Sequence, residues 1–141
     1  MKFFVEIGES AEFTKSIGAE DLARFAELSG DFDPIHMDDA YAAASRYGRR
    51  IAHGILAMAP LSAVSAMISR RAKERGSPGV SVSMGYDRIR FLKPVYMGDT
   101  LTARYTIQSL EGDRSRSKVE VLNQAGELVV AGEHIMKWLP E

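Results

Sequence analysis

The sequence predicts an α+β fold in which an antiparallel β-sheet wraps around one long, buried helix. Apolar residues recur at helical spacing in the first half of the chain, whereas after the Gly/Pro-rich stretch 76–79 they alternate every second residue, as in half-buried strands. Between these halves, the segment from Gly54 to about Lys73 is apolar on most of its sides, which is typical of a buried helix. The length of 141 residues fits a single domain spanning 1–141.

A short strand at 12–17 is expected to open the fold, and two helices follow it. The first helix covers 19–29, with two acidic residues in its first turn, and Gly30 ends it because glycine adopts the left-handed conformation. The second covers 38–45. In the long helix, Pro60 lacks an amide hydrogen and clashes with the preceding turn, so a kink or a late start is expected there.

Four strands are expected in the second half. In the first of them, at 80–91, the apolar alternation switches from even to odd positions, which predicts a β-bulge near Asp87 and Arg88. The other strands are expected at 101–107, 117–122 and 127–138, the last two joined as a hairpin.

Composition excludes several classes of protein. Since there is no cysteine, disulfides, thiolate catalysis, iron–sulfur clusters and Cys-ligated zinc are ruled out. The 18 basic and 19 acidic residues give a net charge of −1, which argues against a general nucleic-acid binder. The N-terminal apolar run is interrupted by Glu6 and Glu9, and 51–68 is interrupted by polar residues, so neither a signal peptide nor a membrane span is predicted. We therefore expect a cytoplasmic protein without nucleic-acid or membrane partners.

The densest polar cluster is 29–36 (SGDFDPIH), a predicted loop between two helices. Pro34 fixes its own backbone and pushes Asp33 toward an extended conformation. A stiff loop that holds Asp31 and His36 suits general acid–base chemistry, because imidazole titrates near neutrality and a carboxylate can share a water with it. The spacing leaves an alternative open, in which the aspartates only cap helices and the histidine is structural.

Metal sites fit the spacing poorly. A calcium loop needs an oxygen ligand where Ile35 stands and a glycine where His36 stands. Zinc ligands could come from His36, Asp38, Asp39 and His53, but their spacing matches no compact zinc motif. We expect no metal and no cofactor.

A second motif, 47–54 (YGRRIAHG), leads into the long helix. A glycine at a helix start exposes free backbone amides, where the helix dipole adds positive potential. Gly54 could therefore bind a carbonyl oxygen that becomes an enolate. Alternatively, it only permits a tight entry into the helix.

Segment 25–36 (FAELSGDFDPIH), followed by 47–54, resembles the MaoC-like dehydratases, among them the (R)-specific enoyl-CoA hydratases (hydratase 2). Segment 90–101 (RFLKPVYMGDTL) is similar to that family's strand and turn after the central helix, and the resemblance covers roughly 12–138. It implies a hot-dog fold and a homodimer with the active-site tunnel at or near the subunit interface. The implied reaction adds water reversibly to a trans-2-enoyl thioester of coenzyme A or acyl-carrier protein, giving an (R)-3-hydroxyacyl thioester.

The resemblance also implies roles for single residues. Asp31 matches the family's catalytic aspartate and His36 its catalytic histidine, which together hold one water. The Gly54 amide matches the donor to the thioester oxygen. Ser62 falls at the supporting serine that orients the aspartate, although a helix serine can instead bond back to a carbonyl, here that of Met58.

Two further residues of these motifs need comment. Asp33 stands where the family usually has asparagine, and an acid there could alter the hydrogen bonds of the loop or raise the pKa of a neighbour by like-charge repulsion. His53 is expected to be a structural donor at the helix entrance rather than a base.

Substrate phosphates and the acyl chain have several candidate contacts. One basic cluster also complements the negative end of the long helix, and it comprises Arg70, Arg71, Lys73 and Arg75. The rival cluster comprises Arg88, Arg90 and Lys93. Four methionines either line an acyl pocket or belong to the core, namely Met58, Met67, Met84 and Met97.

Three other functions remain as alternatives. A hot-dog acyl thioesterase presents an acid or base from its central helix, but no Asp or Glu occurs between Gly54 and Arg70. A non-catalytic acyl-thioester-binding subunit could keep the fold but lose Asp31 or His36, and both are present. A purely structural α+β domain would use the loop only to cap helices.

Overall fold

The computed structural model describes residues 1–140 of the chain. In this part of the chain, five helices follow the first strand and four strands follow the helices. They are β1 (Ser10–Ser16), α1 (Ala19–Ser29), α2 (Pro34–Met37), α3 (Asp39–Ala44), α4 (Gly54–Met58), α5 (Pro60–Glu74), β2 (Val80–Phe91), β3 (Thr100–Glu111), β4 (Arg114–Leu122) and β5 (Leu128–Leu139).

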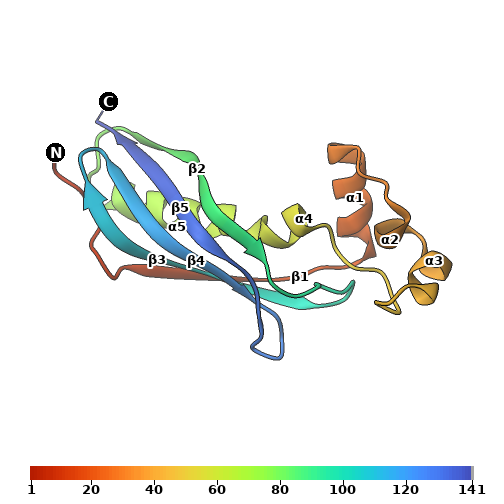
Figure 1. Cartoon of the computed structure of the whole chain (residues 1–141). Coiled ribbons are helices and arrows are strands. Elements are labelled where there is room, and N and C mark those ends of the chain that lie inside the picture. Colours follow the sequence, from red (N-terminus) through yellow and green to blue (C-terminus); the bar gives the residue numbers. More distant parts are fainter. Residues whose placement is uncertain (141) are drawn as a thin grey trace.

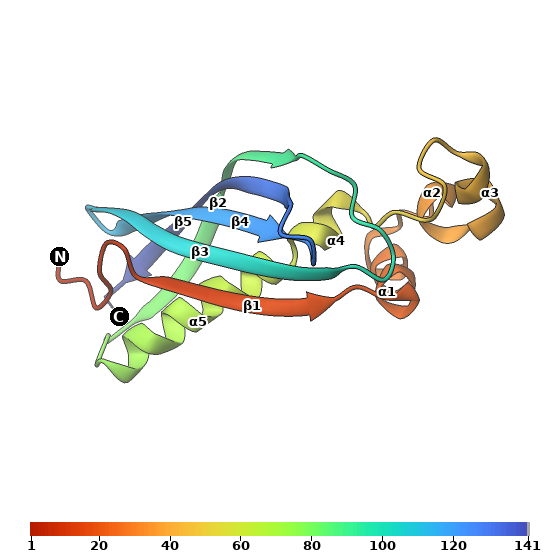
Figure 2. The ribbon, with the colours of Figure 1, turned by 90° about the horizontal axis from the view of Figure 1, so that it is seen from below.

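The strands form one antiparallel sheet in the order β1-β3-β4-β5-β2. The sheet curves along the long helix α5, which packs against β1, β3 and β4 (Figures 1 and 2). This arrangement confirms the predicted α+β class and the hot-dog fold, with a curved sheet around one long helix.

The core lies between α5 and the concave face of the sheet. Leu61, Val64 and Ile68, spaced by three and four residues, are fully buried on one side of α5. Alternate residues of β3, such as Leu101 and Tyr105, face them from the sheet. Each such large side chain stabilises the fold by about 1.5–3 kcal/mol.

The opposite side of the helical segment is not covered within one chain. Ile55 of α4 is 64% exposed, and Ser62 of α5 is exposed as well. The prediction of a helix buried on most of its sides is therefore wrong for the single chain, because the sheet packs against only one side of α5.

The predicted long helix is divided at Pro60. Helix α4 ends at Met58, and α5 begins at Pro60. Proline fits the first turn of a helix, where its missing amide hydrogen has no intrahelical partner to lose. The expected late start is confirmed. None of the helices within residues 1–140 is long and apolar enough to cross a membrane.

The bulge predicted in β2 is also confirmed. The register with β5 shifts between Asp87 and Arg90, and Arg88 has a φ of 56°. A second shift, between Ser83 and Gly85, had no signal in the alternation.

Helices α1–α3 extend beyond one end of the sheet, and both termini lie near the other end (Figures 1 and 2). We call residues 19–44, which contain these helices, the overhang. Helix α1 ends as predicted, because Gly30 adopts a left-handed φ of 83° and its amide donates to the Ala26 carbonyl at 2.8 Å.

A buried histidine lies inside the sheet, on β5. His134 is fully buried, with Nε2 2.7 Å from Ser83 Oγ and Nδ1 2.7 Å from Tyr105 Oη. Burial disfavours the charged imidazolium and lowers the pKa of His134 from 6.5 to about 4. Burial also raises the pKa of Tyr105 to about 12, so this hydroxyl stays protonated.

We expect this histidine to make the stability of the fold depend on pH. Below pH 6.5, His134 binds a proton in the unfolded chain, whereas in the folded chain it binds one only below about pH 4. The free energy of unfolding therefore falls as the pH drops from 6.5 to about 4. The loss amounts to about 3 kcal/mol. Urea unfolding of the wild type and His134→Gln between pH 4 and 7 measures it. An equal pH dependence in both proteins would contradict the assignment.

Candidate active site

Asp31 and His36 lie in the overhang, in a segment that is partly helical. The sequence predicts a loop at 29–36, but the structure forms the short helix α2 there. Asp33 caps it, since its Oδ1 accepts a hydrogen bond from the Ile35 amide at 3.1 Å, and Pro34 occupies the first turn. The loop prediction failed because four residues are too few to show helical periodicity. An asparagine at position 33 could make the same cap through its side-chain oxygen.

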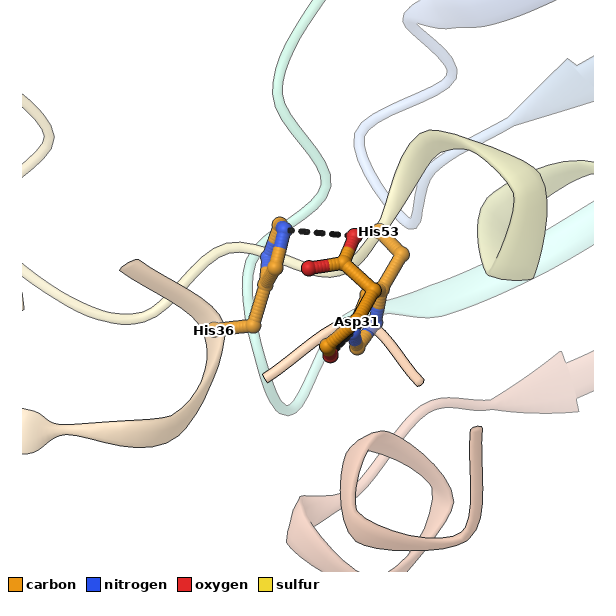
Figure 3. Close-up of side chains that lie close together, drawn as sticks. All are labelled: Asp31, His36 and His53. Atoms are coloured by element: carbon orange, nitrogen blue, oxygen red, sulfur yellow. Dashed lines mark hydrogen bonds and ion pairs between the residues drawn. The ribbon is translucent and has the colours of Figure 1, made fainter. Parts of the chain in front are cut away.

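The structure brings Asp31 and His36 together (Figure 3). Asp31 Oδ2 lies 3.8 Å from His36 Nε2, and the other oxygen, Oδ1, accepts from the Asp33 amide at 3.1 Å. The Asp31 side chain is 48% exposed and that of His36 is 12% exposed. One carboxylate oxygen is thus held by the backbone, and the other faces the imidazole.

The hydrogen bonds of His36 determine its tautomer. Nδ1 lies 2.8 Å from the Ile51 carbonyl oxygen, and because a carbonyl only accepts, Nδ1 carries the hydrogen. The neutral ring then has its lone pair on Nε2, which faces Asp31. Two acceptors with a separation of 3.8 Å can hold one water through both of its hydrogens.

Arg50, which the sequence did not single out, holds the end of α2. Its guanidinium donates to the carbonyl oxygens of His36 at 3.2 Å and Met37 at 3.4 Å, and it pairs with Asp39 at 3.0 Å. Arg50 and His36 are 14 positions apart. A contact at this separation is not part of any helix or strand periodicity, so the sequence does not reveal it.

A pocket of about 370 Å³ opens beside His36. Gly54, the first residue of α4, lines it, and Phe91, Val129 and Val130 contribute apolar walls. Asp31 is not among the lining residues and reaches this space through its contact with His36. The site thus combines an acid–base pair, the start of a helix and an apolar pocket.

The possible metal-ligand atoms of Asp31, His36 and His53 lie within 4.8 Å of one another, which makes these residues candidates for a shared metal ion. The two imidazoles are stacked, with centroids 3.9 Å apart and planes inclined by 26°. Since nitrogen lone pairs lie in the ring planes, those of two stacked rings do not converge on one ion. His53 Nε2 is also bonded to the Asp31 carbonyl oxygen. The residues do not fit a shared metal ion.

Ser62 makes neither of the two hydrogen bonds considered for it. Among the described residues, no bond joins its hydroxyl to Asp31 or to the Met58 carbonyl, and its side chain lies on the uncovered side of α5. Its orienting role stays a prediction.

The basic clusters separate clearly in space. Arg71 and Arg75 pair with Glu9, and Lys73 donates to the Gly79 carbonyl, so these residues fasten the end of α5 to neighbouring segments. Lys93 instead lines the pocket and pairs with Glu127. Three of the four methionines pack against the core, which favours the structural interpretation, and these are Met58, Met67 and Met97.

Comparison with known proteins agrees with this fold. The family model described as "MaoC like domain" matches residues 3–128. The (R)-specific enoyl-CoA hydratase of Aeromonas caviae is 33% identical over 135 residues, which cover 94% of this chain and 95% of that protein. The 3-hydroxybutyryl-CoA dehydratase of Methylorubrum extorquens is 31% identical over 134 residues, covering 94% and 80% of the two chains. The structure of the R-hydratase PhaJ1 from Pseudomonas aeruginosa superposes with a TM-score of 0.84 at 37% identity, covering 99% of this chain and 86% of that one.

A hot-dog domain with these relatives defines an enzyme of the hydratase and dehydratase class. Within that class, the chain belongs to the MaoC-like dehydratase family.

Proposed function

We propose that this enzyme catalyses the reversible hydration of trans-2-enoyl thioesters, with coenzyme A as carrier, to (R)-3-hydroxyacyl thioesters. The observation that carries the proposal is the pair of acceptors, Asp31 Oδ2 and His36 Nε2, that face each other across 3.8 Å beside the pocket. The names of the relatives support the substrate class and the (R) configuration.

In the proposed mechanism, Asp31 and His36 hold one water through its two hydrogens. The water oxygen bonds to C3 while Asp31 accepts a proton, and the π electrons of the C2–C3 bond move to the thioester oxygen as an enolate. The enolate then collapses, and the proton that Asp31 accepted passes through His36 Nε2 to C2.

The Gly54 amide supplies the donor to the enolate oxygen. As the first residue of a helix, it has no intrahelical acceptor for its N–H, and it lines the same pocket as His36. A cytoplasmic location and a reaction without metal or cofactor are part of the same proposal.

Loss of the enoyl absorbance of crotonyl-CoA at 37 °C tests the proposal. We expect absorbance to fall without release of free thiol, and chiral analysis to give the (R) product. Thiol release without hydration would instead indicate a thioesterase. No turnover of CoA or carrier-protein thioesters of any chain length would indicate a non-catalytic acyl-binding subunit.

We expect Gly54→Ala to lower kcat/KM at least about tenfold. A Cβ atom at Gly54 would lie 2.8 Å from Cε2 of the Phe91 ring, which lines the pocket. The added methyl group therefore displaces this ring and crowds the amide. The double variant Gly54→Ala/Phe91→Leu relieves the clash and recovers part of the loss. Wild-type kcat/KM in the single variant would contradict the close approach.

We further propose that the chain forms a homodimer through the edge strand β2, which has no strand partner on its outer side among residues 1–140. Such an edge exposes free N–H and C=O groups. Large apolar side chains are exposed along β2, after it and at α4, namely Ile55, Val80, Val82, Met84, Phe91 and Leu92.

Light scattering should give twice the chain mass of 15.5 kDa. Val82→Lys on β2 should shift the protein toward monomer, whereas Phe13→Lys on the opposite edge strand, β1, is the matched control and should remain dimeric. A monomeric wild type would refute the dimer.

A further inference from the structure

His53 contacts both residues of the proposed catalytic pair. Its imidazole stacks on that of His36 with centroids 3.9 Å apart, and its Nε2 lies 3.0 Å from the main-chain carbonyl oxygen of Asp31 (Figure 3). The side chain is only 3% exposed, and Phe25 packs on it with ring centroids 4.7 Å apart. This ring is therefore fixed in place by its neighbours.

The contact with Asp31 is directional. A carbonyl oxygen only accepts, so Nε2 of His53 carries the hydrogen. Nδ1 is buried and has no hydrogen-bond partner within residues 1–140. An N–H at this position would be left unpaired, so the neutral Nε2–H tautomer fits the site.

The position of His53 in the chain also connects it to Gly54 and Ile51. It directly precedes Gly54, whose amide is the proposed donor to the enolate oxygen, and it follows Ile51 closely. Ile51 binds helix α2 twice, because its carbonyl accepts from His36 Nδ1 and its amide donates to the Ile35 carbonyl at 3.3 Å. Segment 51–54 thus binds the acid–base pair on one side and presents the oxyanion donor on the other.

We propose that His53 is a positioning residue, which sets the placement of Asp31 and His36 relative to the start of α4 through one hydrogen bond and one stacked ring. His53 itself is not among the residues that line the pocket. This inference rests on the proposed hydratase function, and it assigns a role in catalysis where the sequence predicted only a structural donor.

Variants can separate the two contacts. His53→Gln keeps a donor near Nε2 but loses the stacked ring, His53→Phe keeps the ring but loses the donor, and His53→Ala loses both. We expect His53→Ala to lower kcat about 10- to 100-fold, since small displacements of catalytic groups cost this much, with KM changed less than about twofold. The Gln and Phe variants should each retain more of kcat than the Ala variant.

His134→Gln is the matched control, because it also replaces a buried histidine but lies in the sheet. It should lower stability and leave kcat unchanged. The proposal is overturned if kcat of folded His53→Ala is within about twofold of the wild type. It is also overturned if only KM rises, or if the Gln and Phe variants are no better than Ala.

A measurement on the wild type does not depend on activity or on variant folding. The chain has three histidines, so long-range ¹H–¹⁵N spectra at pH 8 can report each tautomer. We expect Nε2–H for His53 and Nδ1–H for His36. The Nδ1–H tautomer of His53 would overturn the inference even in an active hydratase, whereas failure of the proposed function would appear as a wild type that does not hydrate enoyl thioesters.

Discussion

Replacement of Asp31 by asparagine is expected to lower kcat for hydration about a thousandfold, because the amide cannot accept the proton of the attacking water in the proposed mechanism. The amide oxygen can still accept from the Asp33 backbone at the Oδ1 position, so the loop keeps its conformation. The loss therefore comes from the missing base. Initial rates with crotonyl-CoA measure the loss of kcat. The melting temperature checks that the variant keeps its fold.

Asp33→Asn is the matched control for this variant. It makes the same change from carboxylate to amide two residues away, and the side-chain oxygen can still cap α2 through the Ile35 amide. It also restores the residue that the family usually carries. We expect kcat within about threefold of the wild type, because the Asp33 side chain accepts a hydrogen bond from the backbone amide of Ile35. If both variants lost kcat equally, removal of either negative charge would have the same effect. Asp31 would then not be the specific base of the reaction.

Replacement of His36 by asparagine is expected to lower kcat at least about a hundredfold and to change KM little. The asparagine amide can donate to the Ile51 carbonyl as Nδ1 does, so the contact that orients the ring is kept. What disappears is Nε2, the atom that faces Asp31 across 3.8 Å.

His36→Gln provides the complementary variant. Its side-chain amide reaches the position of Nε2 and can contact the water, but it cannot accept a proton and it gives up the bond to Ile51. We expect it to remain at least about tenfold below the wild type. If either variant retained wild-type kcat, proton relay through the imidazole would be refuted.

The fold was predictable from the sequence because its signals are local. The change of period after residue 76, the break at Pro60 and the phase shift near Arg88 each appear within a few residues of chain, and each is confirmed. The helix α2 was missed because its stabilising groups, the Asp33 cap and the Arg50 guanidinium, do not act through periodicity. The incomplete burial of α5 was missed because an apolar helix does not reveal what covers it.

The proximity of the candidate site residues was predictable, but most of their contacts were not. The polar cluster at 29–36 and its resemblance to a family motif singled out Asp31 and His36, and the structure brings them within 3.8 Å; their catalytic roles stay a prediction. The stacking of His53 on His36 joins residues 17 positions apart, and no property of the sequence between them encodes it. Ser62 shows the reverse case, a position matched by resemblance that forms no hydrogen bond with Asp31 in the described part of the chain.

Two helices of the overhang, α2 and α3, contribute few buried side chains. Helix α2 has no buried side chain and α3 buries only Ala42, whereas the sheet and α5 hold most of the core. Amide hydrogens of α2 and α3 should therefore exchange with solvent through local openings that leave the sheet intact, whereas Leu22 holds α1 to the core. His36 lies in α2, so each such opening moves His36 relative to the pocket wall that Val129 and Val130 form.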